Sequence, residues 1–472
     1  MLSGSARTAA RMVRLAAGPA ARRGRPGERL AGALERSGPV AIKFGQFLST
    51  RADVFGQAFA DDLARLKDQL PAFPTPEARA EVERALGRPV DALFSEFGEP
   101  AAAASLAQAH RARLKDGRAV AVKVLRPGIE ARVAADTEAL LLAGRLAEGW
   151  DSLRRLEPRA FTQTVARALA LELDLRFEAA GADELRAVME ADGHMAAPAV
   201  VWDGVARRVL TLEWAAGVAL SDPAALEQPG LDRRRLAENL VRGFLAQALD
   251  HGVFHADLHE GNLFVAAPAA IGVVDFGIVG RLGEAERRYL AEILWGFIRR
   301  DYPRIAAVHF EAGYVPPGAD RAAFAQALRA VGEPLFGKTA SEVSMERLLT
   351  QLFEITALFE MRLRPELILL QKTMVTVEGV ARRIDPGLDI WDAAEPVVRR
   401  WVTRELSPAA RVRSLAAEAR AAAAAITALA AREALPATPP APALAPTPGP
   451  WLGFALGALT AALVFLLAAV LR

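Results

Sequence analysis

The sequence predicts an α+β protein with two lobes, and three observations support this class. With 472 residues the chain is longer than one ordinary domain. Strand-like runs alternate with helical patterns in its first part, and its second part is almost entirely helical in pattern. No repeat occurs at the spacing of solenoid proteins, so we expect a globular arrangement of the two parts.

The composition narrows the range of functions. The chain has no cysteine, which excludes disulfides, thiolate metal sites and cysteine nucleophiles and is compatible with a reducing compartment. Lys and Arg total 58 and Asp and Glu total 56, so no overall positive field attracts a polyanion. We therefore expect no nucleic acid among the partners.

The first segment, residues 1–27, is a basic arm that carries arginines and no acid; Glu28 is the first carboxylate. Such an arm is typical of a membrane-surface segment, of an organellar transit peptide or of a solvated tail, and the sequence does not decide between them. Residues 28–95 have a helical pattern, and the run PTPE in the second half of this segment begins a further helix.

A β-hairpin is predicted in the first lobe, residues 96–215. Its strands are Gln108–Leu114 and Arg118–Leu125, and the intervening Asp116-Gly117 is a strong turn signal. Helical patterns follow between residues 130 and 195. A further strand, Arg208–Glu213, then leads into the connection to the second lobe, residues 216–405.

The second lobe contains the residues that indicate chemistry. The run HADLHEGN places Asp257 and Asn262 five positions apart, and Asp275-Phe276-Gly277 follows after one predicted hairpin. Protein kinases have the same residues at this spacing, since phosphoryl transfer needs a carboxylate at the attacking oxygen and oxygen ligands for Mg²⁺. A short hairpin brings its two ends together, so Asn262 and Asp275 are the predicted Mg²⁺ ligands and Asp257 the catalytic residue. This pattern predicts a protein-kinase-like two-lobed fold.

The run HADLHEGN has two other interpretations. His255 and His259 form an HxxxH pattern that binds metals when it lies on a helix, but a segment followed at once by Gly-Asn and a strand is a poor helix. A purely structural turn is the second alternative. Both are disfavoured because the kinase pattern is met on two separate segments.

The first lobe supplies the expected nucleotide-binding residues. Lys123, in the strand VAVKV, is predicted to contact nucleotide phosphates. An acidic partner is expected on a following helix, and the sequence leaves Glu172 and Glu178 equally open. Glu213 begins the segment EWA, which lies where a hinge would present backbone groups to adenine.

Two features differ from ordinary protein kinases. Alanines replace the glycine-rich loop, so Ala103, Ala104 and Ser105 are predicted to hold the phosphates in another way, through the Ser105 hydroxyl and a helix N-terminus. A helical pattern begins at Glu284, soon after DFG, which leaves no room for a long activation segment. A docking platform for protein substrates is therefore not expected.

The C-terminal region predicts a membrane anchor. Trp451–Leu471 is free of charge over 21 residues, and a helix of this length measures ~32 Å, enough to cross a bilayer core. Gly453 and Gly457 form a GxxxG pattern that favours a homodimer of such helices. The full C-terminal order is an Ala-rich helix at 406–435, a Pro-rich linker at 436–450 and a single transmembrane helix at 451–471.

Taken together, these motifs resemble those of the UbiB/ADCK family of atypical kinase-like proteins. The resemblance runs from about Leu34 to Asp389. Its pieces are KFGQ at Lys43–Gln46 (the KxGQ motif), AAAASLAQAHRA, VAVKVLRPGI, Glu172-Leu173-Asp174 (the ExD motif), VLTLEWAAG, the HAD and DFG segments, and VTVEGVARRIDP.

The resemblance implies several properties. Residues 28–95 would form a helical KxGQ extension that covers the active site, with Lys43 and Gln46 facing the nucleotide and Glu172 available to Lys43. The cofactors would be ATP or ADP with Mg²⁺, and the role would be a kinase or ATPase activity that supports ubiquinone (coenzyme Q) biosynthesis. Expected partners are the lipid bilayer, polyprenyl-quinone precursors and quinone-biosynthesis proteins.

The chain also departs from the family pattern. Leu258 and Glu260 replace the two prolines of the usual HADPHPGN, which loosens the loop and adds a carboxylate beside the metal site. Many bacterial members end in two membrane spans, whereas one is predicted here. The composition is typical of a GC-rich bacterium, so the anchor would lie in the inner membrane with the lobes in the cytoplasm.

Two other functions remain open at this point. A non-catalytic pseudokinase could organise quinone-synthesising enzymes at the bilayer, and the alanine loop favours this reading. A small-molecule kinase similar to aminoglycoside phosphotransferases shares the HxD and later Asp but lacks the KxGQ extension.

Overall fold

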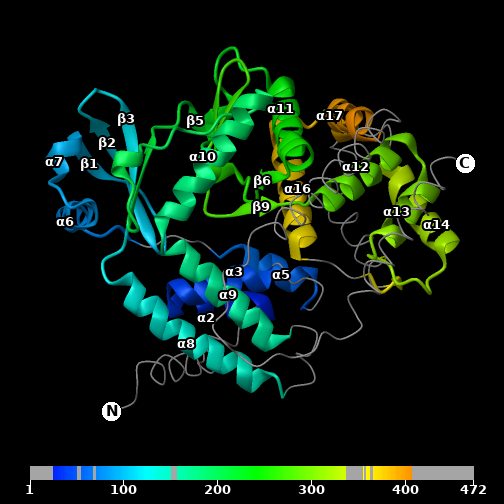
Figure 1. The fold of residues 1–472 in the computed structure, drawn as a ribbon, viewed down its shortest axis with the longest axis horizontal. Coiled ribbons are helices and arrows are strands. Elements are labelled where there is room, and N and C mark those ends of the chain that lie inside the picture. Colours follow the sequence, from blue (N-terminus) through cyan, green and yellow to red (C-terminus); the bar gives the residue numbers. More distant parts are fainter. Residues whose placement is uncertain are drawn as a thin grey trace, which may run out of the picture. The chain divides into compact units, whose positions relative to one another are not determined.

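The computed structural model describes residues 25–49, 55–66, 71–149, 157–335, 355, 358–361 and 365–406, which are drawn in colour in Figure 1. Across these ranges no helix combines the length and the apolar character that a bilayer crossing requires. The predicted transmembrane helix at 451–471, the linker and nearly all of the Ala-rich helix and the basic arm lie outside the described residues.

In its described residues, the N-terminal extension contains the helices α2 (Pro26–Ser37), α3 (Pro39–Ser49) and α5 (Gln57–Ala64). They pack around a small apolar cluster that includes Leu34, Ile42 and Leu63. Gly45, the glycine of KFGQ, is needed at this contact, because a Cβ there would lie 2.3 Å from Leu66 and 2.6 Å from Leu34. The glycine therefore permits the close approach of α3 to its neighbours.

The first lobe is built on an antiparallel sheet with the strand order β1-β2-β3-β4. Its strands are β1 (Phe94–Ala103), β2 (Ala107–Leu114), β3 (Ala119–Leu125) and β4 (Val209–Glu213). The predicted hairpin is confirmed as β2 and β3, in which Ala109 pairs with Lys123. Val120, Val122 and Val124 are fully buried on one face. Because side chains alternate along a strand, Lys123 lies on the opposite face.

The boundary of this lobe differs from the one the sequence suggested. Helices α6 (Thr75–Leu86) and α7 (Val90–Leu93) pack on the sheet through Val82 and Val90 and so belong to it physically. The alanine run is also less of a loop than expected, because Ala103 pairs with Gln108 at the end of β1. Pairing with β2 gives these backbone groups hydrogen-bond partners.

Long helices are inserted between strands β3 and β4 of this sheet: α8 (Ile129–Ala147), α9 (Pro158–Glu172) and α10 (Leu175–Asp192). α9 lies beside α8 and against α3, as Figure 1 shows. Asp174 separates α9 from α10 because its carboxylate accepts the Arg176 backbone N–H at 3.2 Å and caps α10. The break redirects the chain toward β4.

The second lobe carries short strands among helices. The strands are β5 (Val218–Ala219), β6 (Val253–His255), β7 (Leu263–Ala266), β8 (Ala270–Val273) and β9 (Val279–Arg281). The helices are α11 (Arg233–Ala246), α12 (Glu284–Arg299), α13 (Tyr302–Glu311), α14 (Arg321–Gly332), α16 (Pro365–Ile384) and α17 (Ile390–Glu405). The short strand β9 was not expected; it follows DFG and pairs with β6.

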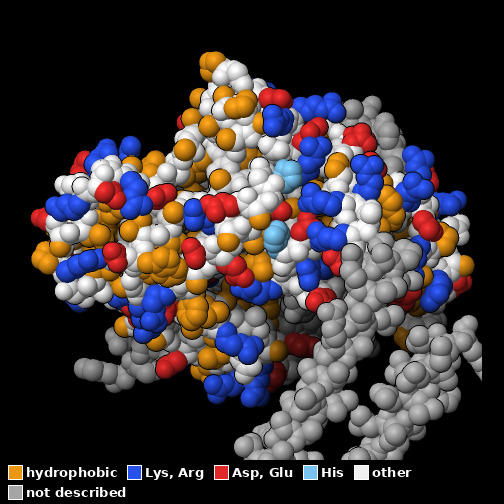
Figure 2. Space-filling model, turned by 45° about the horizontal axis from the view of Figure 1, so that its top comes forward, with side chains coloured by type: hydrophobic (Ala, Val, Ile, Leu, Met, Phe, Trp, Pro, Cys, Tyr) orange, Lys and Arg blue, Asp and Glu red, His pale blue; other side chains and the backbone are white. Residues whose placement is uncertain are grey.

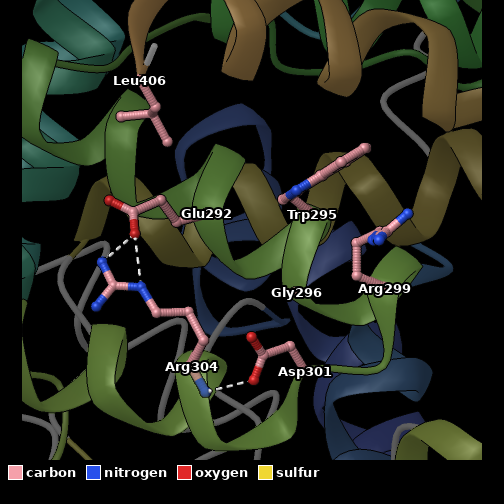
Figure 3. A pocket seen from close by; sticks show the side chains of 7 residues that line it. All are labelled: Glu292, Trp295, Gly296, Arg299, Asp301, Arg304 and Leu406. Atoms are coloured by element: carbon pink, nitrogen blue, oxygen red, sulfur yellow. Dashed lines mark hydrogen bonds and ion pairs between the residues drawn. The ribbon is translucent and has the colours of Figure 1, made fainter. Parts of the chain in front are cut away.

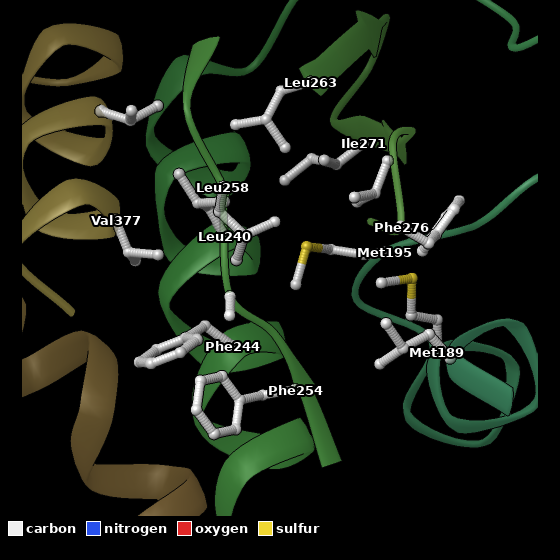
Figure 4. Close-up of a cluster of buried hydrophobic side chains, with 14 of the residues drawn as sticks. Met189, Met195, Leu240, Phe244, Phe254, Leu258, Leu263, Ile271, Phe276 and Val377 are labelled. Atoms are coloured by element: carbon white, nitrogen blue, oxygen red, sulfur yellow. The ribbon is translucent and has the colours of Figure 1, made fainter. Parts of the chain in front are cut away.

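Buried side chains hold the loops of the second lobe in place. Figure 4 shows Leu258, Phe254 and Phe276 among side chains from α10, α11 and α16, and each of the three is at most 1 % exposed. These residues lie next to His255, Asp257 and Asp275, so the core fixes the backbone that carries them. On the face drawn in Figure 2, basic and acidic side chains are interspersed.

Candidate functional site

The centre of the site is the ammonium of Lys123. Its Nζ lies 2.7 Å and 2.9 Å from the two carboxylate oxygens of Glu178 on α10 and 3.4 Å from Oδ1 of Asp275. Three segments that are distant in the sequence, β3, α10 and DFG, therefore meet at one ion-paired cluster. Of the two candidates Glu172 and Glu178, Glu178 is therefore the partner of Lys123.

The charges of the cluster shift the pKa values of Lys123, Glu178 and Asp275. The Lys123 ammonium holds the pKa of the Asp275 carboxyl well below its usual range, and Lys43 acts in the same direction. Burial alone would lower the pKa of Lys123, but the carboxylates of Asp275 and Glu178 outweigh it and raise that pKa. Burial raises the pKa of Glu178, and Lys123 opposes this rise. Lys123 and Asp275 are thus both charged around neutral pH.

The position of Asp275 leaves its carboxylate accessible. Its side chain is 52 % exposed, and its backbone has a positive φ of 63°, which few non-glycine residues adopt. The carboxylate is therefore accessible to solvent although Lys123 balances its charge from one side.

The histidine of HAD orders the catalytic loop. His255 is fully buried; its Nε2 lies 2.8 Å from the Asp275 carbonyl oxygen, and its Nδ1 accepts the Asp257 N–H at 3.1 Å. These contacts require the neutral tautomer that carries its proton on Nε2, and burial lowers the pKa of His255 accordingly. Both ring nitrogens are used, so His255 has none left for a metal, which argues against the HxxxH interpretation.

The predicted Mg²⁺ ligands lie at the open end of the β7–β8 hairpin. Leu263 pairs with Val273, and the Val274 N–H donates to the Asn262 carbonyl at 2.9 Å, so Asn262 and Asp275 are close in the backbone. The Asn262 amide nitrogen donates to the Asp257 carbonyl at 3.0 Å, which leaves the amide oxygen as a possible ligand. An amide and a carboxylate oxygen suit Mg²⁺, which takes one or two protein ligands and completes its shell with phosphate oxygens and water.

Within the described residues, no group of three or more His, Asp or Glu side chains is arranged to hold a metal ion. The pair Asn262 and Asp275 would therefore depend on nucleotide phosphates for its remaining ligands. Their assignment as ligands stays a prediction.

The KxGQ motif lies on α3, and this helix contributes a second lysine near the cluster. Lys43 on α3 lies 3.1 Å from the Glu172 carboxylate at the end of α9, as the family resemblance implied. Its charge also acts on Asp275. Gln46 is half-buried on the same helix. The two lysines thus have different carboxylate partners, Glu172 for Lys43 and Glu178 for Lys123.

The alanine loop and the hinge show contacts that the sequence did not indicate. The Ala104 carbonyl accepts the Arg126 guanidinium at 2.8 Å and 3.0 Å. Ser105 is fully buried, so its side chain is not exposed toward the cleft. Glu213 accepts Arg118 at 2.8 Å, and its backbone N–H donates to Ala199. The roles proposed for these residues in nucleotide binding stay predictions.

The two departures from the family loop are explained by packing. Leu258 is 0 % exposed and lies in the core near Leu240 and Val377, so buried apolar surface replaces the rigidity of a proline. Glu260 forms an ion pair with Arg383 at the end of α16. Arg383 thus balances the charge of this carboxylate, which the sequence was expected to add beside the metal site.

Two supporting residues were missed by sequence reasoning. Gln247 is 1 % exposed in a π-helical turn, and its side-chain oxygen accepts the His255 N–H at 3.0 Å. Thr373 on α16 is buried and donates to the Ala256 carbonyl at 3.0 Å. A polar residue at an otherwise apolar helical position is the only sequence signal for either.

Comparison with known protein families agrees with this geometry. Residues 65–309 match the ABC1 atypical kinase-like domain, and residues 328–389 match the UbiB helical domain. The chain is 41 % identical over 396 residues to the probable protein kinase UbiB of Marinobacter nauticus, an alignment that covers 82 % of this chain and 72 % of the relative. It is 40 % identical over 400 residues to the probable protein kinase UbiB of Tolumonas auensis, covering 83 % and 74 %.

A solved structure supports the fold. The complex of Rv3197 with erythromycin from Mycobacterium tuberculosis superposes with a TM-score of 0.55 at 23 % identity, covering 75 % of this chain and 90 % of that one. The two domain matches, the identities of about 40 % and the meeting of the HAD, DFG and lysine segments lead to one conclusion. This chain belongs to the ABC1/UbiB family of atypical kinase-like proteins.

Proposed function

We propose that this protein is a membrane-anchored, Mg²⁺-dependent atypical kinase or ATPase that supports ubiquinone biosynthesis. The observation that carries the proposal is the cluster in which the Lys123 ammonium lies 2.7 Å from Glu178 and 3.4 Å from Asp275. Kinases need this set of charges to hold nucleotide phosphates. The UbiB name of its relatives supports the link to ubiquinone.

Each residue has a role in this proposal. Lys123 neutralises phosphate charge, and Glu178 holds Lys123 in position. Asn262 and Asp275 would hold Mg²⁺, which when bound neutralises phosphate charge and aligns the phosphate chain. Asp257 orients the attacking hydroxyl or water and accepts its proton, and His255 fixes the backbone of both aspartates.

The acceptor in this proposal is water or a small or lipid-related molecule, although the relatives carry the name of probable protein kinases. Two observations support a small acceptor. α3 comes close enough for Lys43 to act on Asp275, and α12 begins at Glu284, soon after DFG. Both leave little room for an extended polypeptide beside the cleft.

The proposed location follows from the predicted span at 451–471. The lobes would lie on the cytoplasmic side of a bacterial inner membrane, where ATP is available, and would act on polyprenyl-quinone precursors with quinone-biosynthesis proteins nearby. A homodimer through the GxxxG helix is part of the same proposal.

The test is hydrolysis or transfer from radiolabelled ATP by the full chain, with and without liposomes. Asp275→Ala is expected to abolish Mg²⁺-dependent turnover, because Asp275 is both a ligand and a partner of Lys123. Asp203→Ala, a change at an exposed aspartate outside the cleft, is the matched control. Unchanged turnover in Asp275→Ala would refute the mechanism, and a wild type that binds nucleotide without turnover would favour the pseudokinase alternative.

A further inference from the structure

An open hollow of about 450 Å³ lies beside the catalytic loop. It is lined by Ser221 near β5, by His259, Glu260 and Gly261 of the loop, and by Val375, Thr376, Gly379 and Val380 of α16. Its size falls in the range of sites for small molecules. The three elements that form it come from distant parts of the sequence.

A second cavity, of about 220 Å³, lies apart from the catalytic residues. It is lined by residues of α12 and α13, by Asp301 between them and by Leu406. Figure 3 shows Glu292 and Arg304 turned toward each other there, with a hydrogen bond of 2.9 Å from the Arg304 Nε. Its main charged groups therefore bind one another, and it suggests no ligand.

The hollow beside the loop is close to the residue expected to activate the acceptor. His259 lines it, and the Nε2 of His259 lies 3.8 Å from Oδ2 of Asp257. The side chain of Asp257 is 34 % exposed, so a molecule can approach it. His259 therefore borders the hollow and also lies beside the catalytic carboxylate.

The lining favours an uncharged ligand. Glu260 is its one carboxylate, and this group is already paired with Arg383. None of the lining residues is a lysine or arginine. A charged ligand would lose water there without gaining an opposite charge, whereas Val375 and Val380 offer apolar surface. The Thr376 hydroxyl donates to the Lys372 carbonyl at 3.0 Å and so offers the ligand an acceptor.

We propose that this hollow binds the phosphoryl acceptor, and that the acceptor is an uncharged hydroxyl compound with an apolar body. The inference rests on the proposed function and names its acceptor site. The acceptor oxygen forms a bond to the γ-phosphorus of ATP while the bond from that phosphorus to the ADP oxygen breaks. Asp257 takes the hydroxyl proton, and ADP leaves with the bonding electrons.

Gly379 provides a direct means of closing the hollow. A Cβ at this position would meet no atom within 4 Å, and its backbone does not require glycine. A leucine there fills the hollow without strain in α16. Gly318, an exposed glycine outside the hollow with equally open surroundings, gives a matched control.

The experiment uses a photoreactive diazirine derivative of hexanol with the full chain, followed by mass spectrometry of the labelled peptides. We expect labels on His259–Gly261 and Val375–Val380 that excess hexanol suppresses and that hexanoate and hexylammonium do not. Gly379→Leu should reduce this labelling by about tenfold or more, the effect of excluding roughly two methylene groups. Gly318→Leu should leave it unchanged.

Nucleotide turnover in the same preparations separates the two proposals. The acceptor site is overturned if wild type and Gly379→Leu are labelled equally, or if hexanoate suppresses the labelling as well as hexanol does. Basal ATP hydrolysis in the same preparations would still uphold the proposed function. Absent Mg²⁺-nucleotide turnover in the wild type overturns the proposed function and the acceptor role with it. Formation of hexyl phosphate by wild type and Gly318→Leu, but not by Gly379→Leu, supports both.

Discussion

Replacing Glu178 with glutamine tests the ion pair at the centre of the site. The carboxylate of Glu178 makes two contacts with Lys123, at 2.7 Å and 2.9 Å, and is 9 % exposed. Glutamine has the same shape but no charge, so it keeps at most one neutral hydrogen bond. Lys123 would then be held mainly by Asp275 at 3.4 Å, away from the position that phosphates require.

The contacts of Glu178 with Lys123 set the expected loss of turnover in Glu178→Gln. Hydrogen bonds to a charged group contribute about 1.5–3 kcal/mol. The Lys123 side chain is 27 % exposed, so solvent screens part of this energy. We therefore expect the loss of the Glu178 charge to cost about 1.5 kcal/mol of transition-state stabilisation. This corresponds to roughly a tenfold loss of turnover. The free energy of unfolding should fall by less than the roughly 3–5 kcal/mol lost when a buried charge is left without a partner, because Asp275 still pairs with Lys123.

The assay is Mg²⁺-dependent ATP turnover by the full chain, with the free energy of unfolding measured in urea. Glu184→Gln on the same helix is the control, since Glu184 pairs with Arg281 at 2.6 Å on the exposed side of α10. Glu172→Gln, which disturbs Lys43 and not Lys123, should reduce turnover less than Glu178→Gln. Full turnover in Glu178→Gln, or the reverse order of the two variants, would refute the assignment.

Leu258→Ala should destabilise the fold by about 2–5 kcal/mol in urea, whereas Leu358→Ala, at a position 73 % exposed, should change little. Burial lowers the pKa of His255 below its usual value of 6.5. Below pH 6.5 the histidine is protonated more readily in the unfolded chain, so its contribution to stability is complete above that pH and is lost on acidification. The free energy of unfolding, measured above and below pH 6.5, checks this. Asp250→Ala should lower the free energy of unfolding in urea by about 1 kcal/mol, because it releases two half-exposed arginines of α17; a similar loss in Asp250→Asn, which removes the charge and keeps the shape, would support a charge effect, and no loss in that variant would contradict it. Deletion of residues 436–472 should move the protein from the membrane to the soluble fraction, and retention on the membrane would contradict the predicted anchor.

Much of the candidate site was predictable because its residues lie in short, local patterns. The Asp-Gly turn predicted the β2–β3 hairpin and, with it, the place of Lys123 on the second strand. The short hairpin after Asn262 predicted that Asn262 and Asp275 approach one another in the backbone. Such features depend on neighbours within a few residues, which the sequence displays directly.

Other contacts could not be predicted, because they depend on where distant elements pack. Glu260 was expected to add charge near the metal site, but Arg383 pairs with it from the end of α16. Leu258 was expected to loosen the loop, but it is buried in the core. Both outcomes follow from the position of α16, which lies more than a hundred residues further along the chain.

By itself, the sequence determined the α+β class, the kinase-like fold and the family, because these rest on residue types at set spacings. Only the tertiary structure decided between Glu172 and Glu178. Both lie in one helical pattern, but the Asp174 cap ends α9 and starts α10 in a new direction. Glu172 therefore meets Lys43 on α3 and Glu178 meets Lys123 on β3, since the angle between two helices depends on their packing and not on the spacing of their residues.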